Sequence, residues 1–234
     1  MLVTLLLIYP ILFSFLYQLC FVEKLELSYL TLRSRCDDCL KEIRLLELIP
    51  VLSFIFLRGT SSCCNRKINI FYLIGELLSL IPLFYIFYVP HNLIDNATLL
   101  LIYLFLLILA IYDLKTYTVP LHVIVVFAIC ICFITPLHIM SFLFVTSLLH
   151  VFYILFHNAI GYGDIIIFSL LALALPSIEF SIILLFTFIC GGLFALFILI
   201  VFHNESSKIP LIPFIYLAFN ITLLTYQNFI FGGF

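Results

Sequence analysis

Apolar residues gather in long runs along this chain, and short polar segments separate the runs. Most runs come close to the roughly 20 residues that an α-helix needs to cross the hydrocarbon core of a bilayer. The pattern predicts eight membrane-spanning helices, near residues 2–22, 70–90, 97–112, 119–136, 139–157, 165–178, 180–202 and 209–231. We therefore expect an all-α polytopic membrane protein with three parts: a first helix (1–22), a loop domain (23–69) and a seven-helix membrane domain (70–234).

The composition supports this class, because 66% of the residues are hydrophobic and only 9% are charged. A net charge of −2 gives no basic footprint for nucleic acid, so we expect no nucleic-acid partner. The first apolar run has no basic segment before it and no small-residue cleavage site after it. We expect it to be a retained helix rather than a signal peptide.

The distribution of charge predicts an orientation. Eight of the ten Lys and Arg residues lie in the loop domain: Lys24, Arg33, Arg35, Lys41, Arg44, Arg58, Arg66 and Lys67. Because basic loops of membrane proteins stay on the cytoplasmic side, we expect a cytoplasmic loop domain and outward-facing termini. We interpret the basic residues as a surface near anionic lipid headgroups, with orientation of a substrate as the alternative.

Two aspartates stand at the edges of apolar runs, where removal from water costs a carboxylate several kcal/mol. Asp113 ends the third predicted span and Asp164 opens the sixth, so the predicted orientation places both near the cytoplasmic face. Asp113 falls at a helix C-terminus, where the negative end of the helix dipole disfavours a carboxylate. Asp164 has a structural alternative, because it also fits the N-cap of the following helix.

Two neighbouring carboxylates suit aspartyl protease chemistry. Such a pair holds one proton, so that the charged member activates water while the neutral member polarises the scissile carbonyl. The chain contains neither H-E-x-x-H nor G-x-S-x-G. A proton-coupled transporter using the same aspartates is the alternative function, although transport sites tend to lie nearer the bilayer midplane. An interaction scaffold would need neither carboxylate.

The segment Gly161-Tyr162-Gly163-Asp164 resembles the G-x-G-D loop of the bacterial type IV prepilin peptidases, and Asp113 to Pro120 resembles the segment around their first aspartate. Further similar segments follow the family's order: 33–39, 47–54, 57–59, and Pro210 with Pro213-Phe214. The resemblance implies catalytic roles for Asp113 and Asp164 and an active-site loop of Gly161, Tyr162 and Gly163. It implies an enzyme of the bacterial cytoplasmic membrane that removes the basic leader from pilin-like precursors of pili, type II secretion or competence. It implies no cofactor for proteolysis.

Many members of that family also methylate the new N-terminus with S-adenosylmethionine, an activity of the first cytoplasmic loop and its surroundings. Glu47 and Glu76 resemble acidic positions of the family, whereas residues 13–17 depart from its G-S-F-L-N segment. Leu121 and Ile166 depart from the family pattern as well, but neither change removes a catalytic carboxylate. We therefore expect S-adenosylmethionine as a cofactor only if methylation is retained.

Four of the eight cysteines lie in the loop domain: Cys36, Cys39, Cys63 and Cys64. Because a reducing cytosol disfavours disulfides, a C-x-x-C pair followed by two more cysteines fits a tetrahedral structural zinc. The family's second pair is also C-x-x-C, which in this chain would fall on Ser61 and Cys64, with Cys63 as the substitute. Two ligands from adjacent residues, Cys63 and Cys64, would strain the tetrahedral geometry around a zinc ion. A four-coordinate zinc, a three-coordinate site and four unligated thiols all stay open.

Overall fold

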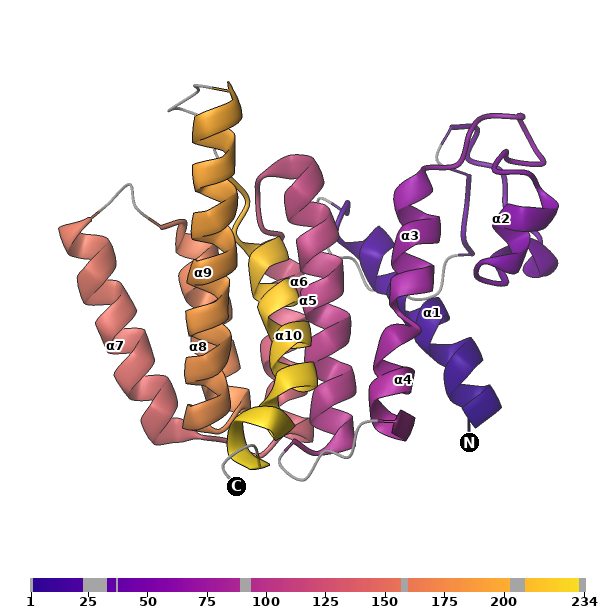
Figure 1. Ribbon diagram of the computed structural model, residues 1–234. Coiled ribbons are helices and arrows are strands. Elements are labelled where there is room, and N and C mark those ends of the chain that lie inside the picture. The colour runs from indigo at the N-terminus through magenta and orange to yellow at the C-terminus, as the bar shows by residue number, and fades with distance from the viewer. Residues whose placement is uncertain are drawn as a thin grey trace. The chain divides into compact units, whose positions relative to one another are not determined.

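The computed structural model describes residues 2–22, 33–36, 38–88, 94–156, 160–202 and 209–231. Over these residues the protein is all-α, as predicted, and its β pairing is limited to two isolated bridges. The helices are α1 (Leu2–Leu19), η2 (Leu45–Leu48), α2 (Leu52–Phe56), α3 (Ile70–Leu78), α4 (Ile81–Tyr88), α5 (Asn96–Thr116), α6 (Leu121–Ile134), α7 (Ile139–Leu155), α8 (Tyr162–Ala174), α9 (Ser177–Phe202) and α10 (Ile212–Phe231). Figure 1 labels the α-helices. The chain divides into two compact units, residues 1–84 and 85–234.

Three described segments are long and apolar enough to cross a membrane: Ile70–Phe87, Asn96–Thr116 and Ser177–Val201. Five shorter apolar helices accompany them: Thr4–Leu19, Leu121–Ile134, Ile139–Leu155, Tyr162–Ala174 and Ile212–Thr225. Each of the eight predicted segments is thus helical, and the protein is a helical membrane protein. The number of crossings and the side of the membrane on which the loop domain lies stay predictions.

The first of the long segments is not one continuous helix. It divides into α3 and α4 at Ser79 and Leu80, where the Ser79 hydroxyl donates to the carbonyl oxygen of Glu76 at 2.7 Å. A side-chain hydroxyl bonded to a backbone carbonyl of the preceding turn is a common companion of a bend. The apolar pattern continues across this position, so the sequence alone predicted a single span.

In the first unit, α1 packs against α3. The fully buried ring of Phe13 occupies the space beside Gly75, where any larger residue would overlap with it. Phe13 also stacks on Tyr17, with 5.6 Å between ring centroids. The loop between the two helices folds back twice through the isolated bridges Arg35–Glu42 and Thr60–Lys67. These two turns bring the four loop cysteines into one region.

The second unit is built around α5, whose side chains are buried along most of its length. α6 and α10 pack against α5, α9 packs against α10, and α7 packs against α8 at the edge of the unit (Figure 1). Phe105 of α5 stacks on Phe127 of α6 at 4.6 Å between ring centroids. The hydroxyls of Tyr103 and Tyr216 join α5 to α10 at 2.5 Å. A central helix that is shielded on most sides by its neighbours is a suitable place for a buried carboxylate.

Candidate active site

Asp113 lies in the last turn of α5, and its residue is only 5% exposed. The helix ends at Thr116, and Tyr117 follows in the left-handed conformation with φ 54°, donating its N–H to the carbonyl oxygen of Asp113 at 2.9 Å. The predicted position near the C-terminus of a helix is therefore correct. The dipole of α5 alone would disfavour a charged Asp113 at this end.

The start of α10 offsets that disadvantage. The backbone N–H of Ile212, the first residue of α10, points to Oδ2 of Asp113 at 3.4 Å. The first N–H groups of a helix have no partner within it and carry the positive end of its dipole. Asp113 therefore lies between the negative end of one helix and the positive end of another. The sequence indicated this segment only through the similarity of Pro210 and Pro213-Phe214 to the family pattern.

Asp164 is not the N-cap of its helix, so the structural alternative raised from the sequence is wrong. α8 begins at Tyr162, and its N-cap is Gly161 in an extended conformation, which makes Asp164 the third helical residue. The Gly161 N–H donates to the Asp164 carboxylate, and a Cβ atom at residue 161 would lie 3.0 Å from Oδ2 of Asp164. An acidic residue at this position that reaches back to the N-cap N–H forms one half of a capping box. The carboxylate is therefore held at the start of α8.

The structure brings the two aspartates together. Their carboxylates are close enough to interact electrostatically. The segment that follows α5 also touches the segment that starts α8, because Val119 lies against Gly163. A Cβ atom at residue 163 would come within 2.6 Å of Cγ2 of Val119, so only glycine allows this approach. Because two neighbouring negative charges repel each other, the pair favours a state in which the two carboxylates hold one proton between them.

An aromatic cluster borders the same end of α8. The half-exposed ring of Tyr162 makes edge contacts with His150 and Tyr153 of α7, at 5.8 and 5.7 Å between ring centroids. Nδ1 of His150 donates to the carbonyl oxygen of Thr146 at 2.8 Å, which fixes the orientation of its ring. His150 and Tyr153 could not be identified from the sequence, because single aromatic residues in an apolar run are usually packing or lipid contacts.

The four loop cysteines form a second candidate site. The sulfur atoms of Cys36, Cys39, Cys63 and Cys64 all lie within 4.8 Å of one another. Their separations include 3.7 Å between Cys36 and Cys64 and 3.1 Å between Cys39 and Cys63. Four sulfurs at about 2.3 Å from a tetrahedral zinc stand roughly 3.8 Å apart, so this donor set fits the metal. Adjacent Cys63 and Cys64 thus both reach the cluster, while the Ser61 hydroxyl contacts the Cys64 sulfur at 3.1 Å.

Local hydrogen bonds shift the pKa values of two of the four cysteines. The backbone N–H groups of Cys39 and Asp38 donate to the Cys36 sulfur and lower the pKa of Cys36 to about 7. Hydrogen bonds with Cys39 and Cys36 raise the pKa of Cys63 to about 12, so the thiols share protons rather than ionising together. A bound zinc would supply the positive charge that four neighbouring thiolates require.

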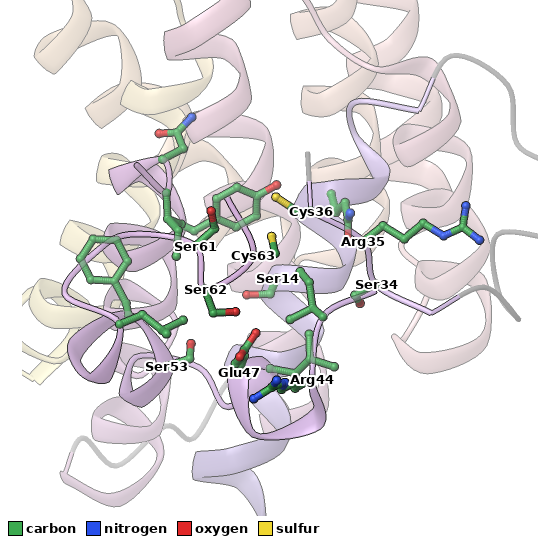
Figure 2. A pocket seen from close by; sticks show the side chains of 18 of the residues that line it. Ser14, Ser34, Arg35, Cys36, Arg44, Glu47, Ser53, Ser61, Ser62 and Cys63 are labelled. Atoms are coloured by element: carbon green, nitrogen blue, oxygen red, sulfur yellow. The ribbon is translucent and has the colours of Figure 1, made fainter. Parts of the chain in front are cut away.

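A pocket of about 810 Å³ lies in the first unit beside the cysteine cluster. Figure 2 shows Cys36 and Cys63 at one side of this pocket and Glu47 with Arg44 at another. The lining combines both signs of charge, and its charged members are Arg35, Asp38, Lys41, Glu42, Arg44, Glu47, Arg66, Lys67 and Glu76. A ligand that carries both positive and negative groups would match such a lining.

Glu76 braces this pocket. Its buried carboxylate accepts a hydrogen bond from the Ser14 hydroxyl of α1 at 2.5 Å and another from the Val51 N–H at 2.7 Å. Val51 has φ 61°, an unfavourable conformation for a β-branched residue. One carboxylate therefore joins α1, α3 and the strained turn before α2. The sequence indicated Glu76 only by resemblance and gave no sign of its partner at Val51.

Comparisons with known proteins agree with the resemblance. Residues 7–89 match the bacterial peptidase A24 N-terminal domain, and residues 100–196 match the type IV leader peptidase family. A prepilin leader peptidase/N-methyltransferase of Vibrio cholerae is 33% identical over 88 residues, which are 38% of this chain and 35% of that protein. Proteins of the same name match from Dichelobacter nodosus (41% over 58 residues, 25% and 20% of the two chains) and Bacillus subtilis (38% over 55 residues, 24% and 22%). The matches thus span about a third or less of these relatives, and no solved structure matches the chain.

Proposed function

The chain belongs to the type IV leader peptidase family, and we propose that it is a membrane aspartyl endopeptidase that removes the leader peptide from prepilin-like precursors. The observation that carries the proposal is the proximity of Asp113 and Asp164, whose carboxylates interact although they are 51 positions apart along the chain. The contact between Val119 and Gly163 holds the two segments together. The expected loop of Gly161, Tyr162 and Gly163 is the N-cap and first turn of α8, and the substrate would lie beside this helix start.

The mechanism follows from the shared proton. The ionised carboxylate takes a proton from a water molecule as that water attacks the scissile carbonyl carbon. The protonated carboxyl donates a hydrogen bond to the carbonyl oxygen, on which negative charge develops. Collapse of the tetrahedral intermediate releases the amine, which receives a proton from the pair. Backbone N–H groups of Gly161 and Ile212 hold the two carboxyl groups in place during these steps.

The membrane side of the reaction follows from the distribution of charge. Asp113 and Asp164 belong to helix ends, and the basic loop between α1 and α3 favours a cytoplasmic position by the positive-inside rule. Cleavage would then occur at the cytoplasmic face of the bacterial cytoplasmic membrane, where the basic leader of a pilin-like precursor meets its apolar segment. The bilayer and these precursors are the expected partners.

The first unit favours a second activity, N-methylation of the cleaved product with S-adenosylmethionine. S-adenosylmethionine carries a sulfonium, an ammonium and a carboxylate, and it supplies the methyl group when bound. The pocket offers carboxylates such as Glu47 for the cationic groups and guanidinium groups such as Arg35 for the anionic group. The brace between Ser14 and Glu76 keeps this pocket in shape although residues 13–17 depart from the family pattern.

A structural zinc completes the proposal. Cys36, Cys39, Cys63 and Cys64 would hold it, and Cys36 and Cys63 also line the pocket. Small domains that lack a large apolar core are commonly closed by such a metal. Zinc would therefore keep the loop folded, and it takes no part in peptide hydrolysis.

The experiment that tests this function is incubation of the purified, reconstituted protein with a synthetic prepilin-like precursor, followed by intact-mass spectrometry. We expect the mass of the precursor to fall by the mass of its leader. With S-adenosylmethionine present, we expect the mass of the cleaved product to rise by about 14 Da for each methyl group that is added. A precursor that stays intact, together with proton-coupled solute uptake into the same vesicles, would favour the transporter instead.

A further inference from the structure

α2 has two unlike faces. The residues on one side line the pocket: Ser53, Phe54 and Leu57. On the other side Leu52, Ile55 and Phe56 are 48%, 61% and 82% exposed. Residues three and four positions apart lie on the same side of a helix, so these three side chains form one continuous surface. We call this surface the apolar face of α2.

Both ends of α2 are tied to the start of α3. After α2, the carbonyl oxygen of Gly59 accepts the N–H of Ile68 at 2.9 Å, two residues before α3 begins. Before α2, the N–H of Val51 donates to Glu76, which lies six residues into α3, or about 9 Å along its axis. α3 opens the membrane-capable segment Ile70–Phe87. α2 therefore lies beside the first two turns of a predicted membrane span.

That position corresponds to the interface between water and hydrocarbon. The polar layer on each side of a bilayer is about 5 to 8 Å thick, which is similar to the length of α3 that α2 accompanies. An exposed basic residue, Arg58, follows α2 directly after its C-cap Leu57. Apolar side chains next to basic side chains are the pattern of helices that lie in the surface of an anionic membrane.

We propose that the apolar face of α2 inserts into the interfacial layer of an anionic bilayer, with Arg58 binding the headgroup phosphates. The hydrogen bonds of Val51 with Glu76 and of Gly59 with Ile68 favour lipid over a protein partner, because they hold α2 beside the start of a predicted membrane span. The charge of Arg58 favours anionic over neutral lipid. The proposal concerns how the loop domain is anchored, and it does not depend on peptide hydrolysis.

The chain contains no tryptophan, so one substitution creates a single fluorescent reporter. Phe56→Trp places it on the apolar face of α2. As the matched control, Ser62→Trp places it at an exposed position that borders the pocket, in the turn that carries Cys63 and Cys64. Both full-length variants are reconstituted in nanodiscs containing lipids brominated near the top of the acyl chain. We expect quenching of Phe56→Trp to exceed that of Ser62→Trp about threefold, with emission at shorter wavelength.

The charge requirement is tested with Arg58→Gln in the Phe56→Trp protein. We expect quenching to fall about twofold in nanodiscs rich in phosphatidylglycerol and to stay the same in phosphatidylcholine alone, because only the anionic headgroups attract Arg58. Ile55→Trp is a second reporter on the same face and is measured if Phe56→Trp does not fold.

Three outcomes would overturn the proposal. Equal quenching of the face reporter and Ser62→Trp would show that the apolar face of α2 does not enter the bilayer. Emission at shorter wavelength without quenching by brominated lipid would show that protein covers the face, from a second copy or from the chain itself. Quenching that is equal in both lipids and insensitive to Arg58→Gln would remove the role of anionic headgroups.

Discussion

Gly163 lies so close to Val119 that a Cβ atom on the glycine would come within 2.6 Å of a valine methyl group. This contact joins the segment after Asp113 to the segment that carries Asp164. Because the contact is between a side chain and the backbone of a helix start, it leaves little freedom in the separation of the two carboxylates.

We expect Gly163→Ala to lower the rate of leader cleavage by about 10- to 100-fold, because a shift of about 1 Å at a reacting group has effects of this size. Cleavage is measured with the purified protein and a synthetic precursor. Gly192→Ala is the control, since a Cβ atom at residue 192 in α9 meets nothing within 4 Å. Partial recovery in the double variant Gly163→Ala/Val119→Ala would identify the valine methyl as the cause, and no recovery would contradict it.

Asp113→Asn and Asp164→Asn should each reduce cleavage by about 1,000-fold or more, because an amide removes the proton that the pair shares. Asparagine keeps the shape and a carbonyl oxygen that accepts the N–H of Ile212 or Gly161, so the melting temperature should change little. Asp95→Asn is the matched control, because Asp95 caps α5 by accepting the Ala97 N–H and asparagine caps equally well. Substantial cleavage by either active-site variant would remove that aspartate from the mechanism.

The aromatic cluster should affect binding of the precursor more than the chemical step. Tyr153→Ala removes one support of the Tyr162 ring, so we expect KM to rise about 5- to 10-fold with kcat nearly unchanged. Phe144→Ala, at an exposed position of α7 outside the cluster, should leave both constants as they are. A fall in kcat without a change in KM would instead place Tyr153 in support of Asp164.

Glu76→Ala should separate the two proposed activities. The change leaves the Val51 N–H without its acceptor, which costs about 1–3 kcal/mol where the group is shielded from water. We expect loss of methyl transfer with leader removal retained, both read from the same mass spectrum. Ser14→Ala removes only one of the two hydrogen bonds and should have a smaller effect. Equal loss of both activities would show that Glu76 supports the whole fold.

The purified chain should carry about one zinc ion, measured by elemental mass spectrometry. Cys39→Ser removes one of the four sulfurs and should reduce the zinc content at least fivefold, because the remaining three thiolates bind the ion more weakly. Cys132→Ser, which changes an exposed cysteine of α6 outside the cluster, serves as the control. Unchanged zinc in the Cys39 variant would show that the metal lies elsewhere.

The apolar pattern predicted the helices well, because burial in lipid or protein requires long apolar runs whatever the tertiary contacts are. It placed the start of α8 near residue 165, whereas the helix begins at Tyr162. The resemblance implied a loop of Gly161, Tyr162 and Gly163, whereas Gly161 is the N-cap and the other two residues belong to the first turn of α8. Gly163 contacts Val119, and a contact between distant segments leaves no local signal in the sequence.

The sequence identified the candidate residues but not their hydrogen-bond partners. Asp113 and Asp164 stand out because charge is rare in an apolar chain, and the cysteines stand out by spacing. The partners of these residues are mostly backbone groups, such as the N–H of Ile212 on Asp113 and the N–H of Val51 on Glu76. Every residue type except proline carries a backbone N–H, so residue identity does not reveal these partners. Adjacent Cys63 and Cys64 suggested a strained site, yet the turn of the loop lets both sulfurs join the cluster.

The hydrogen bond from the first residue of α10 to Asp113 has a consequence for biosynthesis. α10 is made well after α5, and without α10 Asp113 would face only the unfavourable end of α5. A nascent chain would therefore complete the surroundings of Asp113 only after α10 has been inserted beside α5. Leader cleavage by a chain still in synthesis would wait for that step.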